Sequence, residues 1–339
     1  IRAGNSLCVA AHPPDPAAVR RAVERGVAWL RRQQRPGGGC GTRKAGRTAL
    51  ALLALRHSGV PAADQACRAA ATRLEGSLPD GTCYGAALGV LLLAPDETKP
   101  RRKGERRVRD LARGQCRNGQ WTYSYRNTAR KKAGDNSNTQ LVILALAAAR
   151  VHRFEVPAET FRRCGAFFRE SQNTDGGFGY AARQRARSYG SMTAGGAMAL
   201  VLCAAAERAT SPGDPELRRL PEVKRALDWL GRGFHPARNR DAAKAFGTKK
   251  GRRGDSFWKH YWLWSLERAG NSAGARKVGG HDWYAEGARL LLSEQRDEGS
   301  WRDPEDELLA TCFALLFFGH STRAVLTPPE RVTTPPAAG

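Results

Sequence analysis

A turn of one shape recurs along this chain, each time after a helical stretch. The clearest copy, at residues 168–180, reads FRESQNTDGGFGY: an apolar residue, a glutamine four residues later, a glycine-containing turn and an aromatic residue. A repeat of about 40 residues or more is typical of stacked supersecondary units. We therefore predict six similar units. Three more plain copies lie at residues 29–41, 111–121 and 291–301, and two weaker ones lie at residues 78–84 and 229–234.

Two kinds of helix alternate around these turns. The stretch before a turn is amphipathic, as at residues 17–30, whereas the stretch after it is apolar nearly all round and rich in small residues. Helices of the second kind are typically buried on every side. The alternation predicts an all-α (α/α)6 toroid, a double ring of inner and outer helices, forming one domain over residues 17–325. The expected inner helices contain residues 48–55, 84–93, 139–148, 193–202, 257–266 and 311–318.

The two ends of the chain fall outside the predicted toroid. We interpret residues 1–16 as an N-terminal extension, in which residues 7–11 could be the remnant of a signal peptide, and residues 326–339 as a proline-rich tail or linker. The longest apolar runs, 141–149 and 308–318, are shorter than the roughly 20 residues of a membrane span. A soluble protein is expected, and its location stays open between the cytoplasm and export.

The eight cysteines include no Cys-x-x-Cys pair and stand among Ala and Leu. In such surroundings cysteine behaves as a small buried hydrophobe. We therefore expect neither a disulfide framework nor a zinc site.

The net charge of +24 is concentrated in particular segments. Four segments that join a turn to the next inner helix, 41–47, 126–132, 181–187 and 235–253, are strongly basic and contain one acidic residue, Asp241. In a toroid they share the rim where the inner helices begin, so helix dipoles favour an anion there. Arginine also suits phosphate. The expected anion-binding residues are Arg130, Lys131, Arg183, Arg185, Lys249, Lys250 and Arg252.

The same rim has a simpler interpretation, a set of solvated loops in an arginine-rich protein. The sixth connector, 302–307, is acidic, so the basic ring is broken on one side. Trp258 and Tyr261 belong to an aromatic inner helix and are expected to line the interior beneath the rim. His260 on the same helix is interpreted as a core histidine.

The repeated turn resembles the QW motif of squalene-hopene and oxidosqualene cyclases, and the glycine turns of protein prenyltransferase β subunits. The resemblance covers residues 17 to about 320. In that superfamily the glutamine binds backbone groups at helix ends and the aromatic residue stacks on a neighbour. The resemblance thus implies a scaffold role for Gln115, Trp121, Gln172, Phe178, Gln295 and Trp301.

Squalene-type cyclases protonate an alkene with a D-x-D-D-T-A segment at the start of an inner helix, and residues 135–140 here read DNSNTQ. Ser137 takes the position of the proton donor, and Asn138 that of the last acid. A serine hydroxyl lacks the acidity that general acid catalysis needs. Asp, Ser and Asn are instead preferred helix N-caps, so we interpret this segment as a cap.

The prenyltransferase resemblance implies a zinc site that this chain lacks. Aligned on residues 256–258 (SFW) and on Thr311 with Cys312, the three ligand positions hold Arg252, Gly254 and Ala310. None of these side chains is a zinc donor. No metal or other cofactor is expected.

Three functional hypotheses remain. The first is a toroid that has lost the known catalytic residues and binds an apolar, isoprenoid ligand with an anionic head, such as a prenyl diphosphate, in its centre. The second is an active terpene cyclase-like enzyme with other catalytic residues, for which Asp135, Asp255 and His260 are candidates. The third is a basic interaction scaffold, more suited to an anionic membrane surface than to nucleic acid, because no nucleic-acid-binding motif is present.

Overall fold

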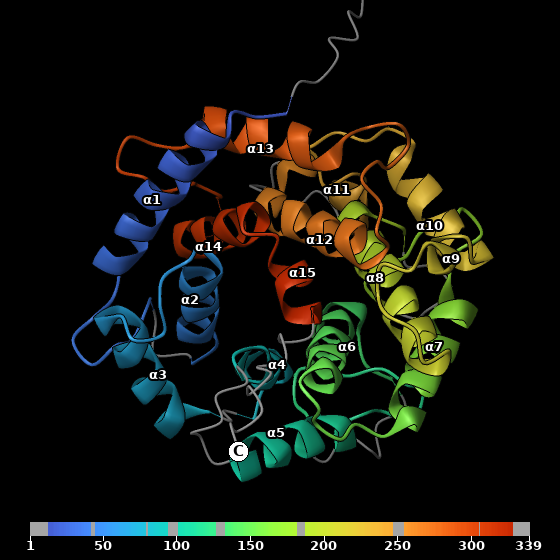
Figure 1. Ribbon diagram of the computed structural model, residues 1–339. Helices are drawn as coiled ribbons and strands as arrows, with labels where there is room; N and C mark the ends of the chain where they lie inside the picture. Colours follow the sequence, from blue (N-terminus) through green and yellow to red (C-terminus); the bar gives the residue numbers. More distant parts are fainter. Residues whose placement is uncertain are drawn as a thin grey trace, which may run out of the picture.

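The helices form two concentric rings around one axis (Figure 1). The inner ring consists of α2 (Ala45–His57), α4 (Cys83–Leu91), α6 (Asn136–Val151), α8 (Gly190–Glu207), α12 (Lys259–Ser272) and α14 (Glu307–Phe318). Around it lie α1 (Pro16–Arg32), α3 (Gln65–Ser77), α5 (Arg101–Arg113), α7 (Ala158–Ser171), α9 (Pro215–Arg218) with α10 (Pro221–Gly231), and α13 (Trp283–Glu294). The predicted (α/α)6 toroid is confirmed. The computed structural model describes residues 13–41, 45–78, 81–93, 101–126, 133–181, 187–246, 254–304 and 306–327.

The inner helices are buried on all sides because small residues let them approach one another. In α8 a Cβ at Gly195 would lie 2.0 Å from Gln140 Oε1 of α6, and one at Gly196 would lie 2.3 Å from the Phe178 ring. By length and composition α8 could cross a membrane, but 89% of it is buried inside the ring. The outer helices bury one face only, as α1 does with Trp29 and Leu30.

The glutamine of each plain turn joins one repeat to the next. Nε2 of Gln172 donates to the carbonyl of Gly176 in its own turn (2.9 Å) and to the carbonyl of Glu222 in the next outer helix (2.8 Å). Gln115 makes the same pair of bonds. In the first turn this role belongs to Gln34, one residue later than the repeat suggested. Each of these glutamines thus binds the backbone of its own turn and the backbone of the next outer helix, which is the scaffold role expected of them.

The same linkage closes the ring. Gln295 of the last turn donates to the carbonyl of Ala22 in α1 (2.8 Å) as well as to Gly299 in its own turn (2.9 Å). Arg47 of the first connector pairs with Asp306 of the acidic sixth connector. The last repeat is therefore joined to the first in the way that the internal repeats are joined.

A threonine one turn into the inner helix holds the aromatic residue of the turn. The backbone N–H of Trp121 donates to Thr139 Oγ1 (2.9 Å), and that of Trp301 donates to Thr311 Oγ1 (3.1 Å). The indole N–H of Trp121 also donates to the carbonyl of Leu111, ten residues earlier. These bonds satisfy polar groups at helix ends that would otherwise lack partners.

In two places a described residue between a turn and its inner helix contacts the start of a neighbouring inner helix, as expected if the connectors share one rim. The backbone N–H of Gly190, the first residue of α8, donates to the carbonyl of Arg240 (2.9 Å). Asn136, at the start of α6, donates through its side chain to the carbonyl of Gly179 (2.9 Å). We call the end of the ring where the inner helices begin the connector rim.

A short helix, α15 (Ser321–Leu326), occupies the middle of the ring at the opposite end (Figure 1). It contacts α6, α12 and α14. Glu267 of α12 accepts hydrogen bonds from the backbone N–H (3.0 Å) and the hydroxyl (2.7 Å) of Thr322. The interior is thus filled by the chain itself at the end where the inner helices finish. The predictions for residues 1–12 and 328–339 lie outside the described residues.

Candidate functional site

Aromatic side chains of α12 and α14 form a wall on one side of the interior. Trp264 stacks on Phe313 with ring centroids 5.2 Å apart, and Tyr261 meets Phe313 at 5.4 Å. Trp258, just before α12, lies 6.4 Å from Tyr261. Positions 261 and 264 share a face of α12 because a helix turns once in 3.6 residues. The sequence-predicted residues Trp258 and Tyr261 are therefore brought together, and both are half-buried.

Polar side chains from other helices of the inner ring lie beside this wall. Nε2 of Gln140, on α6, donates to the hydroxyl of Tyr261 on α12 (2.8 Å). Because α8 separates α6 from α12 in the ring, this bond crosses the interior. Nearer the connector rim the hydroxyls of Tyr84 and Ser137 bond to each other, and both residues are half-buried. We call Tyr84, Ser137, Gln140, Tyr261, Trp264, Arg268 and Phe313 the axial cluster.

Arg268 is the charged member of the axial cluster, and it is fully buried. Its guanidinium lies 4.0 Å from the centre of the Trp264 ring, a cation–π geometry. Nη2 donates to Ser265 Oγ (2.8 Å) and to Gln140 Oε1 (3.2 Å). No described residue accepts a hydrogen bond from its Nε or Nη1.

Ser137, which occupies the position of the cyclase proton donor, lies in the axial cluster, but Asp135 acts as a helix cap. The Asp135 carboxylate accepts from the backbone N–H of Asn138 (2.8 Å) and from its side-chain amide (2.9 Å). Burial raises the pKa of Asp135 above its usual range, although these bonds and one from Tyr180 oppose the shift. The cap interpretation of residues 135–139 agrees with this geometry.

Two tyrosines lead from Asp135 toward the surface. The hydroxyls of Tyr180 and Tyr123 are 2.5 Å apart, and Tyr123 is 63% exposed. Burial is the largest cause of a raised pKa for Tyr180 and for the nearby Tyr189. Both phenols therefore stay neutral at physiological pH and can donate hydrogen bonds.

Trp258 has a backbone conformation that is rare for a bulky residue. Its φ of +55° and ψ of 39° lie in the left-handed region. Such a conformation costs on the order of 1–3 kcal/mol in a residue with a side chain, and such residues cluster at functional sites. Trp258 contacts Tyr261 of the axial cluster, so its strained backbone makes it a candidate site residue.

His260 does not face the axial cluster. Its Nδ1 lies 3.1 Å from a carboxylate oxygen of Asp303 in the sixth connector, and both side chains are buried. The pair joins two neighbouring repeats, in agreement with a core histidine. The backbone of Asp255 lies in the short helix η1 (Gly254–Ser256), and its side chain is outside the described residues.

The basic residues predicted to bind an anion, Arg130, Lys131, Arg183, Arg185, Lys249, Lys250 and Arg252, lie outside the described residues. Among their described neighbours, Arg240 has structural contacts. It stacks on Trp229 at 4.3 Å, donates to the carbonyl of Trp229 and pairs with Asp241 (3.3 Å). Arg187 and Arg238 are exposed on the connector rim.

The cysteines behave as the sequence indicates. In the described ranges Cys40, Cys67, Cys83, Cys116, Cys164, Cys203 and Cys312 are free and buried. Burial raises the pKa of the Cys40 thiol to about 11, so it stays protonated. The described part of the chain holds no group of three or more His, Cys, Asp or Glu residues that could bind a metal.

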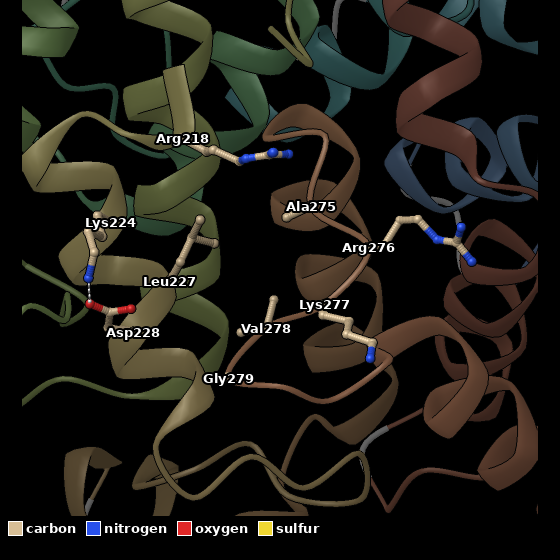
Figure 2. A pocket seen from close by; sticks show the side chains of 9 residues that line it. All are labelled: Arg218, Lys224, Leu227, Asp228, Ala275, Arg276, Lys277, Val278 and Gly279. Atoms are coloured by element: carbon tan, nitrogen blue, oxygen red, sulfur yellow. Dashed lines mark hydrogen bonds and ion pairs between the residues drawn. The ribbon is translucent and has the colours of Figure 1, made fainter. Parts of the chain in front are cut away.

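Two surface hollows lie away from the axial cluster. The larger, of about 890 Å³, is bordered by the start of α1, the ends of α12 and α15, and the start of α13. Figure 2 shows the smaller one, of about 340 Å³, between α10 and the loop that follows α12. There Lys224 pairs with Asp228 (2.7 Å) and Arg218 donates to the carbonyl of Gly274 (3.0 Å). Three of the charged side chains of the smaller hollow thus bind one another or the backbone.

The sequence analysis did not identify Tyr84, Gln140 or Arg268. One signal was present for Arg268, because Glu267 and Arg268 follow an aromatic inner-helix segment in which a buried charge is unusual. Gln140 and Tyr84 carry no such signal, since their roles depend on residues 121 and 53 positions away.

No protein-family model and no curated protein matches the chain in sequence. Solved structures match its fold. The apo structure of the type II terpene cyclase MstE from Scytonema is 14% identical, with a TM-score of 0.53, over 91% of this chain and 99% of that chain. The second is an inactive variant of an alpha-1,6-mannanase from Salegentibacter in complex with alpha-1,6-mannotriose. It is 10% identical, with a TM-score of 0.58, over 91% of this chain and 99% of that chain. A protein from Actinoplanes is 15% identical, with a TM-score of 0.54 over 90% and 99%. The chain thus shares the α/α toroid fold with a terpene cyclase and with a mannanase.

Proposed function

We propose that this toroid binds an apolar ligand of the isoprenoid class that carries an anionic head, at the end of the axis where the inner helices begin. The observation that carries the proposal is the axial cluster itself. Its aromatic wall offers apolar contact area, and the half-buried hydroxyls of Tyr84, Ser137 and Tyr261 offer hydrogen bonds. An apolar wall with a few convergent polar groups is the usual composition of a small-molecule site.

The two kinds of structural neighbour suggest different ligands, and the axial cluster favours one of them. MstE has been solved with a geranylgeranyl dihydroxybenzoate substrate, whereas the mannanase binds a mannose oligomer. Glycoside hydrolysis ordinarily needs two carboxylates on either side of the scissile bond. The three buried carboxylates of the described inner ring and its connectors each have structural partners: Asn138 binds both oxygens of Asp135, His260 binds Asp303, and Thr322 of α15 binds Glu267. This arrangement favours an isoprenoid ligand over a sugar.

An active cyclase-like enzyme is the second candidate. The observation in its favour is the raised pKa of the buried Asp135 carboxyl, because a general acid must hold its proton near the working pH. This hypothesis predicts a cyclised product from a polyprenyl substrate, and the loss of that product in Asp135→Asn. Ligand binding without product supports the binding protein.

Calorimetry tests the proposal. Farnesyl diphosphate should bind more tightly than inorganic pyrophosphate at both 50 and 500 mM salt, because only the prenyl compound uses the aromatic wall. Trp258→Ala should weaken prenyl binding by up to about tenfold, because one aromatic contact contributes about 0.5–1.5 kcal/mol. The exposed Tyr123→Phe is the control and should leave binding unchanged. Equal, salt-sensitive binding of the two compounds would overturn the proposal and indicate generic charge on the connector rim.

A further inference from the structure

Arg268 has no acidic partner among the described residues, although it is fully buried. Arginine carries five N–H donors and no acceptor, and stays charged in proteins. Here the hydrogen bonds from the guanidinium come from Nη2 alone, to Ser265 and Gln140. A buried charge is normally paired, because removing it from water is costly. The Trp264 ring at 4.0 Å offsets part of that cost.

The neighbouring Glu267 does not supply the missing negative charge. It is fully buried, and its two carboxylate oxygens accept from Thr322 and from Asn271 Nδ2 (2.7 Å). Burial raises the pKa of Glu267 to about 7, so part of the population is neutral at physiological pH. Glu267 therefore binds α15, and it acts on Arg268 only through space. No described carboxylate forms a hydrogen bond or ion pair with the Arg268 guanidinium.

A directed chain of hydrogen bonds leads from Arg268 toward the connector rim. Because arginine can only donate, the Gln140 atom that it contacts must be the amide oxygen. Gln140 Nε2 must then donate to the Tyr261 oxygen, at 2.8 Å. The Tyr261 O–H remains to donate toward Tyr84 or toward a ligand. Tyr261 is half-buried, so a group that enters from the rim can reach it.

We propose that Arg268 is the buried counter-charge for the ligand's anionic head, which enters first and accepts a hydrogen bond from the Tyr261 hydroxyl. The expected ligand is an apolar chain that ends in an oxyanion, a phosphate or a carboxylate, with the head inside the ring instead of on the basic rim. This inference rests on the proposed function. Arg268 itself is sealed from solvent and acts as a positioning residue through Gln140, Tyr261 and its electric field.

The field of Arg268 should reach the head. Its Cζ lies 5.6 Å from the centre of the Tyr261 ring, so an oxyanion bound to the Tyr261 hydroxyl would lie roughly 10 Å away. At an effective dielectric constant of about 20, this attraction corresponds to about a tenfold change in affinity. Added salt screens such a buried interaction much less than it screens charges on the rim.

The test compares two ligands that share one chain, farnesyl diphosphate and farnesol, on wild type and on Arg268→Met, Arg268→Lys and Arg238→Met. The ratio of the two affinities is the measured quantity, since a purely structural effect would weaken both ligands alike. We expect wild type to prefer the charged ligand at 50 and 500 mM salt. Arg268→Met should reduce the ratio about tenfold, and Arg268→Lys should restore most of it. Arg238→Met, on the exposed rim, should leave the ratio at 500 mM salt unchanged.

The other outcomes show whether the role of Arg268 or the proposed function is wrong. An unchanged ratio in Arg268→Met, with both ligands still bound, overturns the role of Arg268 and leaves the proposed function standing. A ratio that falls in Arg238→Met at high salt places the head on the rim and also overturns the inference. If wild type binds neither ligand, the proposed function and the inference fail together. Circular dichroism and thermal melting of each variant show that affinities are compared between folded proteins.

Discussion

At the scale of single residues, two adjacent charged side chains are buried in an inner ring that is otherwise largely apolar. Glu267 and Arg268 are adjacent on α12 and both are fully buried, yet they have different tasks. Glu267 binds the first turn of α15, whereas Arg268 faces Gln140 and the aromatic wall. Buried charges reduce stability unless they are paired. We therefore expect both residues to lower the free energy of unfolding in their charged forms.

Glu267 should make the stability of the protein depend on pH. Its pKa is about 7 in the folded chain and 4.5 in the reference state, so the folded state binds the proton more tightly. The stabilising contribution is fully present below pH 4.5 and is lost as the pH rises through 7. At about 1.4 kcal/mol per unit of pKa, the loss amounts to about 3.5 kcal/mol. Glu267→Gln mimics the protonated form and should match wild type at pH 4.5 but be more stable at pH 8.

Urea denaturation of both proteins between pH 4.5 and 8 measures this difference. Other titrating groups cancel in the comparison. One of them is His57, whose pKa burial lowers to about 4 and which acts in the opposite direction. A difference in free energy of unfolding that is constant with pH would contradict the assignment.

At the scale of elements, the glycine turns are joints between successive outer helices. Gly299 has a φ of +99°, and a Cβ there would lie 2.4 Å from the carbonyl oxygen of Arg25 in α1. Gly119 faces the carbonyl of Arg163 in the same way, at 2.3 Å. A side chain at either position is therefore excluded twice, by the backbone conformation and by the packing of the next helix.

A matched pair of substitutions separates these two effects. Gly59 has a φ of +84°, and a Cβ added there would meet no atom within 4 Å, whereas Gly299 has both the positive φ and the close carbonyl. Gly59→Ala should lower the free energy of unfolding by about 1 kcal/mol, the cost of the left-handed conformation. Gly299→Ala should cost more than about 3 kcal/mol, because α1 must also shift. Equal costs in chemical denaturation would show that the turn does not fix the position of α1.

At the scale of the whole molecule, the same linkage runs all the way round the ring. Gln295 joins the last repeat to α1 with the same two hydrogen bonds that Gln172 makes between internal repeats. The ion pair of Arg47 with Asp306 lies across the same closure. An open stack of repeats could unfold from its ends, whereas a closed ring has none.

The closure predicts similar behaviour for two distant variants. Gln295→Leu and Gln172→Leu each leave two carbonyls without a side-chain donor, and each should cost about 3 kcal/mol. Both should keep a single unfolding transition in calorimetry, with similar midpoints. A second, low-temperature transition in Gln295→Leu alone would show that α1 separates first and that the ring has a weak closure.

The architecture could be predicted from the order of the residues, because the period of the turns and the two kinds of helix are local patterns that each repeat carries in full. The same locality made the cap at residues 135–139 and the buried cysteines predictable. The axial cluster required the folded ring, since the bond from Gln140 to Tyr261 joins helices that are not neighbours in it. The place of α15 at one end of the interior also became clear only in three dimensions. Contacts across a ring depend on where the closed chain brings distant residues, which no periodicity along the sequence records.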